Sequence, residues 1–122
     1  MANRAKQKGT SFETLIKRYL NDNGFVKADR TALKGGDDTG DINGISNKQS
    51  GKEVAVQCKN QRKINLSGWL DDTVDQASKI AEDSLPALVV KRVGKGEKAV
   101  GETYVVMRLS DFATLLKEAG YS

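Results

Sequence analysis

The sequence contains no histidine and a single cysteine, Cys58, among its 122 residues. The lack of histidine excludes His-ligated zinc sites and His-based nucleophilic triads, and one cysteine is too few for a Cys-rich zinc site. One cysteine cannot form an internal disulfide, which fits a reducing compartment. No apolar run approaches membrane-spanning length, and no signal-peptide core follows Met1. We therefore expect a cytoplasmic protein with no membrane partner.

The composition favours one small domain with an acidic partner. A chain of 122 residues can bury one core but not two. Its net charge of +4 favours a polyanionic binding partner. Residues 1–9 read as a flexible basic arm, either a disordered terminus or a nucleic-acid contact. The cations gather in three groups, namely Arg4, Lys6 and Lys8, then Lys59, Arg62 and Lys63, and finally Lys91, Arg92, Lys95 and Lys98 around a glycine-rich turn.

Residues 52–60 alternate between apolar and polar side chains, with Val54 and Val56 on one side and Gln57 and Lys59 on the other. This period is typical of a half-buried strand, so we expect Gln57 and Lys59 to lie side by side on the face away from the core.

Two carboxylates stand upstream of this strand. Asp41 begins a second strand pattern, and Glu13 lies in the first turn of a predicted helix, where Thr10 and Glu13 have the form of a capping box. A carboxylate, an amide oxygen and a lysine that meet from neighbouring elements form a divalent-cation site suited to phosphodiester hydrolysis.

The periodicities predict helix, three strands, helix, two strands, helix. This order indicates a three-layer α/β domain with a central mixed five-stranded sheet. We expect residues 10–122 to form this single domain behind the arm. The predicted elements are a helix from Thr10 to Asn23, strands at 25–33, 41–46 and 52–60, a helix capped by Ser67, strands at 86–90 and 103–107, and a helix capped by Ser110.

This order, with its polar positions, resembles the PD-(D/E)xK nuclease superfamily, which has the restriction-endonuclease-like fold. Within that superfamily the chain looks most like the small Holliday junction resolvases of the archaeal and viral type. Each motif alone is common, and the specificity lies in their order and strand placement. The motifs are Lys8–Glu13 at the opening, Gly40-Asp41-Ile42 for the family's Gly-Asp, Val54–Lys59 for the apolar strand ending in (D/E)xK, and Gln76 in the second helix.

The resemblance implies a Mg²⁺ site, in which Mn²⁺ would substitute. Asp41 is the expected central ligand, with Asp37 or Asp38 as the alternative. Glu13 is either a second carboxylate ligand or only the end of the capping box. Gln57 is either an amide ligand in place of the usual carboxylate or an exposed strand residue. Cys58 is expected to be a core side chain whose backbone carbonyl is a ligand by resemblance. Lys59 lies near the attacking water or the scissile phosphate, or is only a surface lysine.

The resemblance also implies the substrate. We expect a Mg²⁺-dependent endodeoxyribonuclease acting on branched DNA, most of all four-way junctions, by in-line attack of water that leaves a 5′-phosphate and a 3′-hydroxyl. Two symmetric cuts suit a homodimer, formed through the last helix or the fifth strand. So compact a nuclease fits a viral genome, and we expect it in the cytoplasm of a prokaryotic or virus-infected host cell. The alternatives are a nicking, repair or restriction-type nuclease, or a catalytically inactive DNA-binding module. The expected DNA contacts are Arg4, Lys6, Lys8, Arg62, Lys63 and Gln76.

Overall fold

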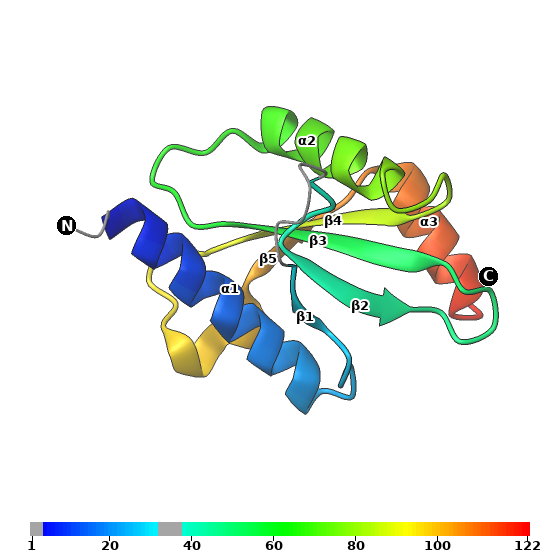
Figure 1. Ribbon diagram of the computed structural model, residues 1–122, viewed down its shortest axis with the longest axis horizontal. Helices are drawn as coiled ribbons and strands as arrows, with labels where there is room; N and C mark the ends of the chain where they lie inside the picture. Colours follow the sequence, from blue (N-terminus) through cyan, green and yellow to red (C-terminus); the bar gives the residue numbers. More distant parts are fainter. Residues whose placement is uncertain (1–3, 32–37) are drawn as a thin grey trace.

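The computed structural model describes residues 4–31 and 38–122, which form a five-stranded mixed sheet with helices on both faces (Figure 1). The strand order is β1-β2-β3-β4-β5, with β3 and β4 parallel and the other pairs antiparallel. The predicted α/β fold and element order are therefore confirmed. The elements are α1 Arg4–Asp22, β1 Asp29–Arg30, β2 Ile42–Ser46, β3 Glu53–Lys59, α2 Leu66–Ser78, β4 Leu85–Val90, the 3-10 helix η1 Glu97–Glu102, β5 Tyr104–Val106 and α3 Leu109–Glu118.

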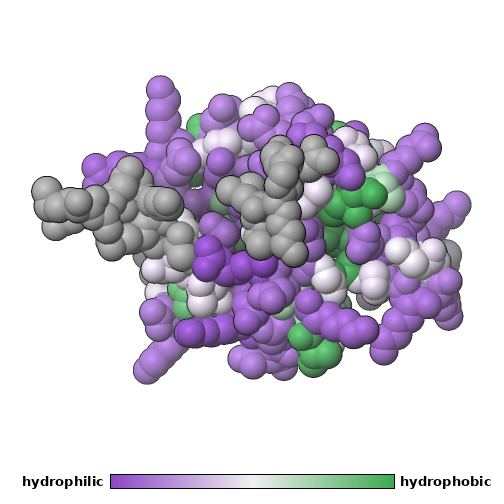
Figure 2. Space-filling view, in the orientation of Figure 1, coloured by the Kyte–Doolittle hydropathy of each residue, from purple (hydrophilic) through white to green (hydrophobic). Residues whose placement is uncertain are grey.

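Two apolar clusters attach α1 and α2 to opposite faces of the sheet. On one face, Phe12 and Ile16 of α1 pack with Val56 of β3 and with further apolar residues of the sheet. On the other face, Trp69 of α2 packs with Leu88 and Val90 of β4. The face of the molecule shown in Figure 2 is mostly hydrophilic, because the large apolar side chains of these clusters point inward.

The prediction that β3 is half-buried is wrong. Ala55 is fully buried and Gln57 is 7% exposed, although both lie on the face that the sequence pattern assigned to solvent. The cause is the parallel pairing of β3 with β4, because a parallel pair needs a crossover connection. Here α2 is that crossover, and it covers the face that carries Gln57.

The predicted N-terminal arm is helical from Arg4 onward. Helix α1 begins there, six residues before the predicted N-cap Thr10. The segment 4–8 consists of good helix formers, and the capping-box pattern did not take their propensity into account. Thr10 therefore lies inside α1 and does not cap it, and residues 1–3 lie outside the described part of the chain.

Three further boundaries differ from prediction. Helix α2 is capped by Asn65 in place of Ser67, and the Asn65 side chain accepts a hydrogen bond from the backbone of Gly68. Helix α3 starts after Arg108 with no side-chain cap. The first strand is only Asp29–Arg30 where the structure describes it, and the predicted end of that strand, 32–33, falls outside.

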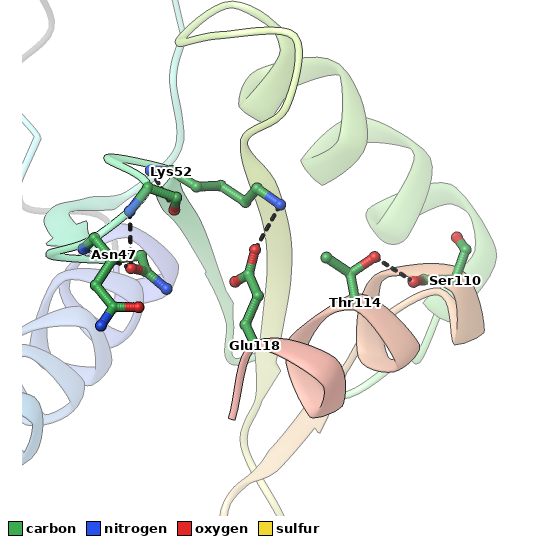
Figure 3. A network of polar contacts seen from close by, with 7 residues as sticks. Asn47, Lys52, Ser110, Thr114 and Glu118 are labelled. Carbon is green, nitrogen blue, oxygen red and sulfur yellow. Dashed lines mark hydrogen bonds and ion pairs between the residues drawn. The ribbon is translucent and has the colours of Figure 1, made fainter. Parts of the chain in front are cut away.

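A polar contact joins the β2–β3 hairpin to the end of the chain (Figure 3). Lys52, just before β3, donates to a Glu118 carboxylate oxygen at 2.7 Å. The backbone of Asn47 closes the hairpin by donating to the carbonyl of Lys52 at 2.8 Å. The ion pair between Lys52 and Glu118 links the hairpin end of the sheet to the last residue of α3. Among the described residues, no helix is long and apolar enough to cross a membrane.

Candidate active site

A polar cavity of about 360 Å³ lies where β3 ends, between the N-terminal half of α1, the start of β2 and helix α2. It brings together the four residues predicted to be catalytic, Glu13, Asp41, Gln57 and Lys59, which come from α1, the β2 entry and β3. The complete lining is Gly9, Glu13, Asp38, Asp41, Gln57, Cys58, Lys59, Asn60, Gln61 and Gln76. We call this space the acidic cavity.

Most of the predicted DNA contacts lie elsewhere. Arg62 and Lys63 are exposed in the loop before α2 and do not line the acidic cavity. Lys8 lines a neighbouring cavity. Arg4 and Lys6 belong to α1, and their side chains lie outside what the structure describes.

Asp41 is held by the backbone on both sides. Its N–H donates to the carbonyl of Val56 at 2.8 Å, and its Oδ2 accepts from the N–H of Cys58 at 2.8 Å. The residue before it must be glycine, because Gly40 has a φ of +101° and an added Cβ would lie 3.1 Å from the Val56 carbonyl oxygen. Sterics therefore explain why a glycine precedes Asp41 in the sequence.

Asn43 supports the same turn, and sequence reasoning missed it. The register of β2 against β3 shifts between Ile42 and Ile45, which is a β-bulge. Within the bulge the Asn43 side chain accepts hydrogen bonds from Thr31 at 2.7 Å and Thr39 at 3.1 Å, and it donates to the Thr39 carbonyl at 3.0 Å. Asn43 thus ties the two ends of the segment that precedes Asp41. A single asparagine in a strand gives no sequence signal for this role.

Burial raises the pKa of two carboxylates in the acidic cavity, and the charge of a neighbouring carboxylate adds to the effect. Burial, and then the charge of Asp41, raise the pKa of Glu13. Burial is also the largest cause that raises the pKa of Asp41, and the charge of Asp38 adds to it. Arg30 of β1 partly offsets this, since its Nε lies 3.6 Å from Glu13 Oε1. Arg30 is a second residue that the sequence did not reveal, because β1 has almost no pattern of its own.

Asp38, which the sequence kept as an alternative to Asp41, lines the cavity beside it. Its Oδ1 accepts from the N–H of Gly40 at 3.0 Å, and its Oδ2 accepts from Gln76 Nε2 at 3.0 Å. Gln76 is buried, and its Oε1 has no hydrogen-bond partner. A buried carbonyl oxygen left unpaired is costly, so this atom is a free acceptor for a ligand or water in the cavity. The other alternative, Asp37, lies outside the described residues.

Gln57 is fixed from α2. Thr73, which is fully buried, has its Oγ1 2.6 Å from Gln57 Oε1 and 2.7 Å from the carbonyl of Trp69. Lys59 follows on the same face of β3, with its ammonium 5.7 Å from the centre of the Trp69 ring. The ring therefore helps to hold the lysine at the cavity. The two residues predicted to share a face do so, beneath a helix.

The Cys58 side chain belongs to the core and not to the set of oxygen donors. Burial, followed by the charges of Asp41 and Glu13, raises its pKa, so that it stays protonated. The thiol packs beside the cluster of Phe12 and Val56, as predicted for a core residue.

A family model described as a restriction endonuclease (Mrr_cat) matches residues 4–76, which is more than half of the chain. The chain belongs to this restriction endonuclease family. The resemblance to PD-(D/E)xK nucleases is thereby confirmed. The match ends in α2, so it includes every residue that lines the acidic cavity. Searches of curated proteins and of solved structures find no match.

Nucleases of the PD-(D/E)xK type usually use Mg²⁺, and the donor set of the acidic cavity suits such an ion. Hard cations prefer oxygen ligands, and the cavity offers carboxylate and amide oxygens with no imidazole or ionised thiol. In the part of the chain that the structure describes, no three His, Cys, Asp or Glu side chains form a group able to hold a metal ion. A cation would therefore need amide, backbone and water oxygens to complete its shell.

Proposed function

We propose that this restriction endonuclease family member is a Mg²⁺-dependent endodeoxyribonuclease that hydrolyses phosphodiester bonds in branched DNA, with the four-way Holliday junction as its substrate. The observation that carries this proposal is the acidic cavity, which gathers Glu13, Asp41, Gln57 and Lys59 from three separate segments. Carboxylates, an amide and a lysine around one space meet the needs of phosphodiester hydrolysis.

In this proposal Asp41 and Glu13 hold the cation, directly or through water, and Gln57 Oε1 and the backbone carbonyl of Cys58 complete the protein ligands. When bound, Mg²⁺ supplies positive charge to the phosphate and lowers the pKa of water at the site. Lys59 adds a second positive charge where negative charge develops on the phosphate. The raised pKa values of Asp41 and Glu13 support the proposal, because burial and then a neighbouring carboxylate disfavour the charged form of each, which a bound cation would stabilise.

The hydrogen bonds of Thr73 support an amide ligand. The Thr73 hydroxyl carries one hydrogen, which can serve only one acceptor fully. If the Trp69 carbonyl takes that hydrogen, a half-turn of the Gln57 amide points its NH₂ group at Thr73 Oγ1. The carbonyl oxygen of Gln57 is then free to face the acidic cavity, where a cation would bind.

A homodimer would give the two symmetric cuts that resolve a junction. The surface that fits this role is the edge strand β5 with the first turns of α3. Large apolar side chains stand exposed there, with Val105 61%, Leu109 81% and Phe112 48% exposed. They line a hollow of about 550 Å³ together with Met107 and Leu115. Clustered exposure of this kind marks an interaction surface, and a second copy of the chain would bury it.

A second candidate is a nuclease that cuts or nicks linear duplex DNA. The family match favours it, because the matching family is one of restriction endonucleases. Both candidates use the same cavity, so the choice between them depends on the substrate.

The decisive experiment is cleavage of an immobile four-way junction, a flap and a linear duplex of matched sequence, with and without Mg²⁺. We expect Mg²⁺-dependent cuts at symmetric positions in the junction. Asp41→Ala should lower cleavage at least about 100-fold while junction binding persists, because phosphate contacts carry the affinity. Asp71→Ala is the matched control, since Asp71 is exposed on α2 and away from the cavity.

The outcomes separate the candidates. Cleavage of the linear duplex at the same rate as the junction would reject junction specificity and support the second candidate. Binding without cleavage in Mg²⁺ or Mn²⁺ would leave an inactive DNA-binding module. Full activity in Asp41→Ala would move the site away from the acidic cavity.

A further inference from the structure

A second cavity, of about 250 Å³, adjoins the acidic cavity, and three lysines line it. Of these, Lys8 comes from α1, while Lys91 and Lys95 come from the segment after β4. The full lining is Lys8, Ser11, Phe12, Leu15, Asn60, Lys91, Lys95, Gly96, Glu97, Val100 and Thr103. We call it the lysine cavity. Of the predicted DNA contacts whose side chains the structure describes, only Lys8 belongs to it.

The two cavities lie next to each other, and a backbone hydrogen bond joins the segments that line them. Asn60 lines both of them. The N–H of Lys91 donates to the carbonyl of Lys59 at 3.0 Å, so the ends of β3 and β4 lie side by side. Helix α1 separates the cavities, with Glu13 facing the acidic cavity and Phe12 the lysine cavity. A strand that crosses Lys59 and follows Asn60 therefore runs onto Lys91.

The wall of the lysine cavity is held in place. Arg92 Nη1 donates to the carbonyl of Glu102 at 3.1 Å, and the guanidinium lies 5.0 Å from the centre of the Tyr104 ring. Lys95 forms an ion pair with Glu102 at 3.1 Å. On the other side, Gly101 lets η1 approach α1, because a Cβ there would lie 2.8 Å from the Tyr19 hydroxyl. These contacts preorganise the segment from Lys91 to Tyr104 without a ligand.

The positive charge of the lysine cavity is not balanced by the residues that the structure describes. Glu102 takes up the charge of Lys95. Lys8 and Lys91 have no ion-pair partner among residues 4–31 and 38–122. Glu97 is the one acid in the lining, and its side chain is exposed. An excess of positive charge in a hollow of this size suits an anion, and a phosphate accepts well from lysine ammonium groups.

We infer that the lysine cavity binds a backbone phosphate of the DNA strand whose scissile phosphate lies at Lys59. Lys91 is the main contact and Lys8 the second, while Lys95 contributes less because Glu102 already holds it. This inference rests on the proposed function and adds to it the direction of the bound strand. The strand leaves the acidic cavity past Asn60 and runs toward η1.

The test is binding of a fluorescein-labelled duplex and junction by anisotropy, in EDTA, from 50 to 200 mM salt. Lys91→Gln should weaken binding about fivefold or more at low salt and lower the slope of log K against log salt by about 0.9, the loss of one phosphate contact. Lys95→Gln should change the slope by less than half as much. Lys48→Gln is the matched control, because Lys48 lies exposed in the turn at the opposite end of β3, and it should match wild type.

An unchanged slope in Lys91→Gln would overturn the inference, and so would equal losses in Lys91→Gln and Lys48→Gln, which would show only an effect of net charge. Failure of the wild type to bind either DNA would overturn it as well. The proposed function is judged separately by Asp41→Ala, which should lower cleavage at least about 100-fold and keep the salt slope of wild type. If the salt slope falls in Lys91→Gln but the protein cuts no DNA, phosphate binding at the lysine cavity would stand and the proposed nuclease function would be rejected. Thermal unfolding of each variant checks that the lost affinity is not lost folding.

Discussion

Replacing Gln57 by glutamate tests the least usual of the ligands proposed for the acidic cavity. The substitution keeps the size of the side chain and adds one negative charge at a position that is 7% exposed. The cavity already contains Glu13, Asp38 and Asp41. Burial raises the pKa of both Glu13 and Asp41, and the charge of a neighbouring carboxylate adds to each shift. Without a cation, Gln57→Glu should therefore destabilise the fold by about 1–4 kcal/mol, the free energy of burying or protonating a carboxyl at pH 7.

With Mg²⁺ present, the same charge becomes favourable. A carboxylate about 4 Å from a cation gains several kcal/mol at an effective dielectric constant of about 20, and desolvation cancels most of that gain. We expect a net increase in Mg²⁺ affinity of about tenfold or more, or about 1.4 kcal/mol. Turnover need not rise, because tighter binding of the ground-state ion does not stabilise the transition state.

The assay is a Mg²⁺ titration of thermal unfolding, supported by the same titration of cleavage at saturating DNA. Mg²⁺ should raise the melting temperature more in Gln57→Glu than in wild type, since binding to the folded state alone stabilises it. Gln61→Glu is the matched control, because Gln61 lines the same cavity but is exposed, and it should shift the affinity by less than about threefold. Superimposable curves for wild type and Gln57→Glu would sink the claim that Gln57 is a ligand, and Asp38 would take its place.

Three other predictions follow from single contacts. Thr73→Val removes the hydroxyl beside Gln57 at the same volume, and urea unfolding should show a loss of about 1–3 kcal/mol. Gly44→Ala should cost more than Gly51→Ala, because both have positive φ but only at Gly44 would a Cβ collide with the Lys27 carbonyl; equal melting temperatures would contradict this steric argument. The Cys58 thiol, whose pKa burial raises, should react with Ellman's reagent at pH 8 only after unfolding, and a fast reaction in the folded protein would refute its placement.

The candidate site could be predicted from the sequence because its parts are local. Alternation in residues 52–60 places Gln57 and Lys59 on one face whatever the strand pairs with, and a glycine before Asp41 marks a turn that leads into a strand. What alternation cannot show is what covers that face. Burial of Gln57 depends on the parallel partner β4 and on α2, which lie later in the chain. The strand was therefore identified correctly, and its exposure was not.

The missed residues share one property, which is that their roles depend on long-range contacts. Asn43 acts through Thr31, twelve residues away, and Arg30 acts through Glu13 on another element. The lysine cavity combines α1 with the segment after β4, which no local pattern connects. The start of α1 was missed for a different reason. The capping-box pattern at Thr10 is real in the sequence, but helix propensity and packing extend the helix past it to Arg4.

The geometry gives a physical reason for an amide where the superfamily pattern has a carboxylate. Gln57 is the deepest of the cavity's polar side chains on β3, and Thr73 holds it from a helix that excludes water. A charge at that depth would be the most costly one in the cavity, beside two carboxylates whose pKa values are already raised. An amide keeps an oxygen donor at the same place without that penalty, so the cation-free protein stays stable. The proposed function therefore predicts weaker cation binding than a carboxylate at this position would give, and the Mg²⁺ titration of Gln57→Glu tests this prediction.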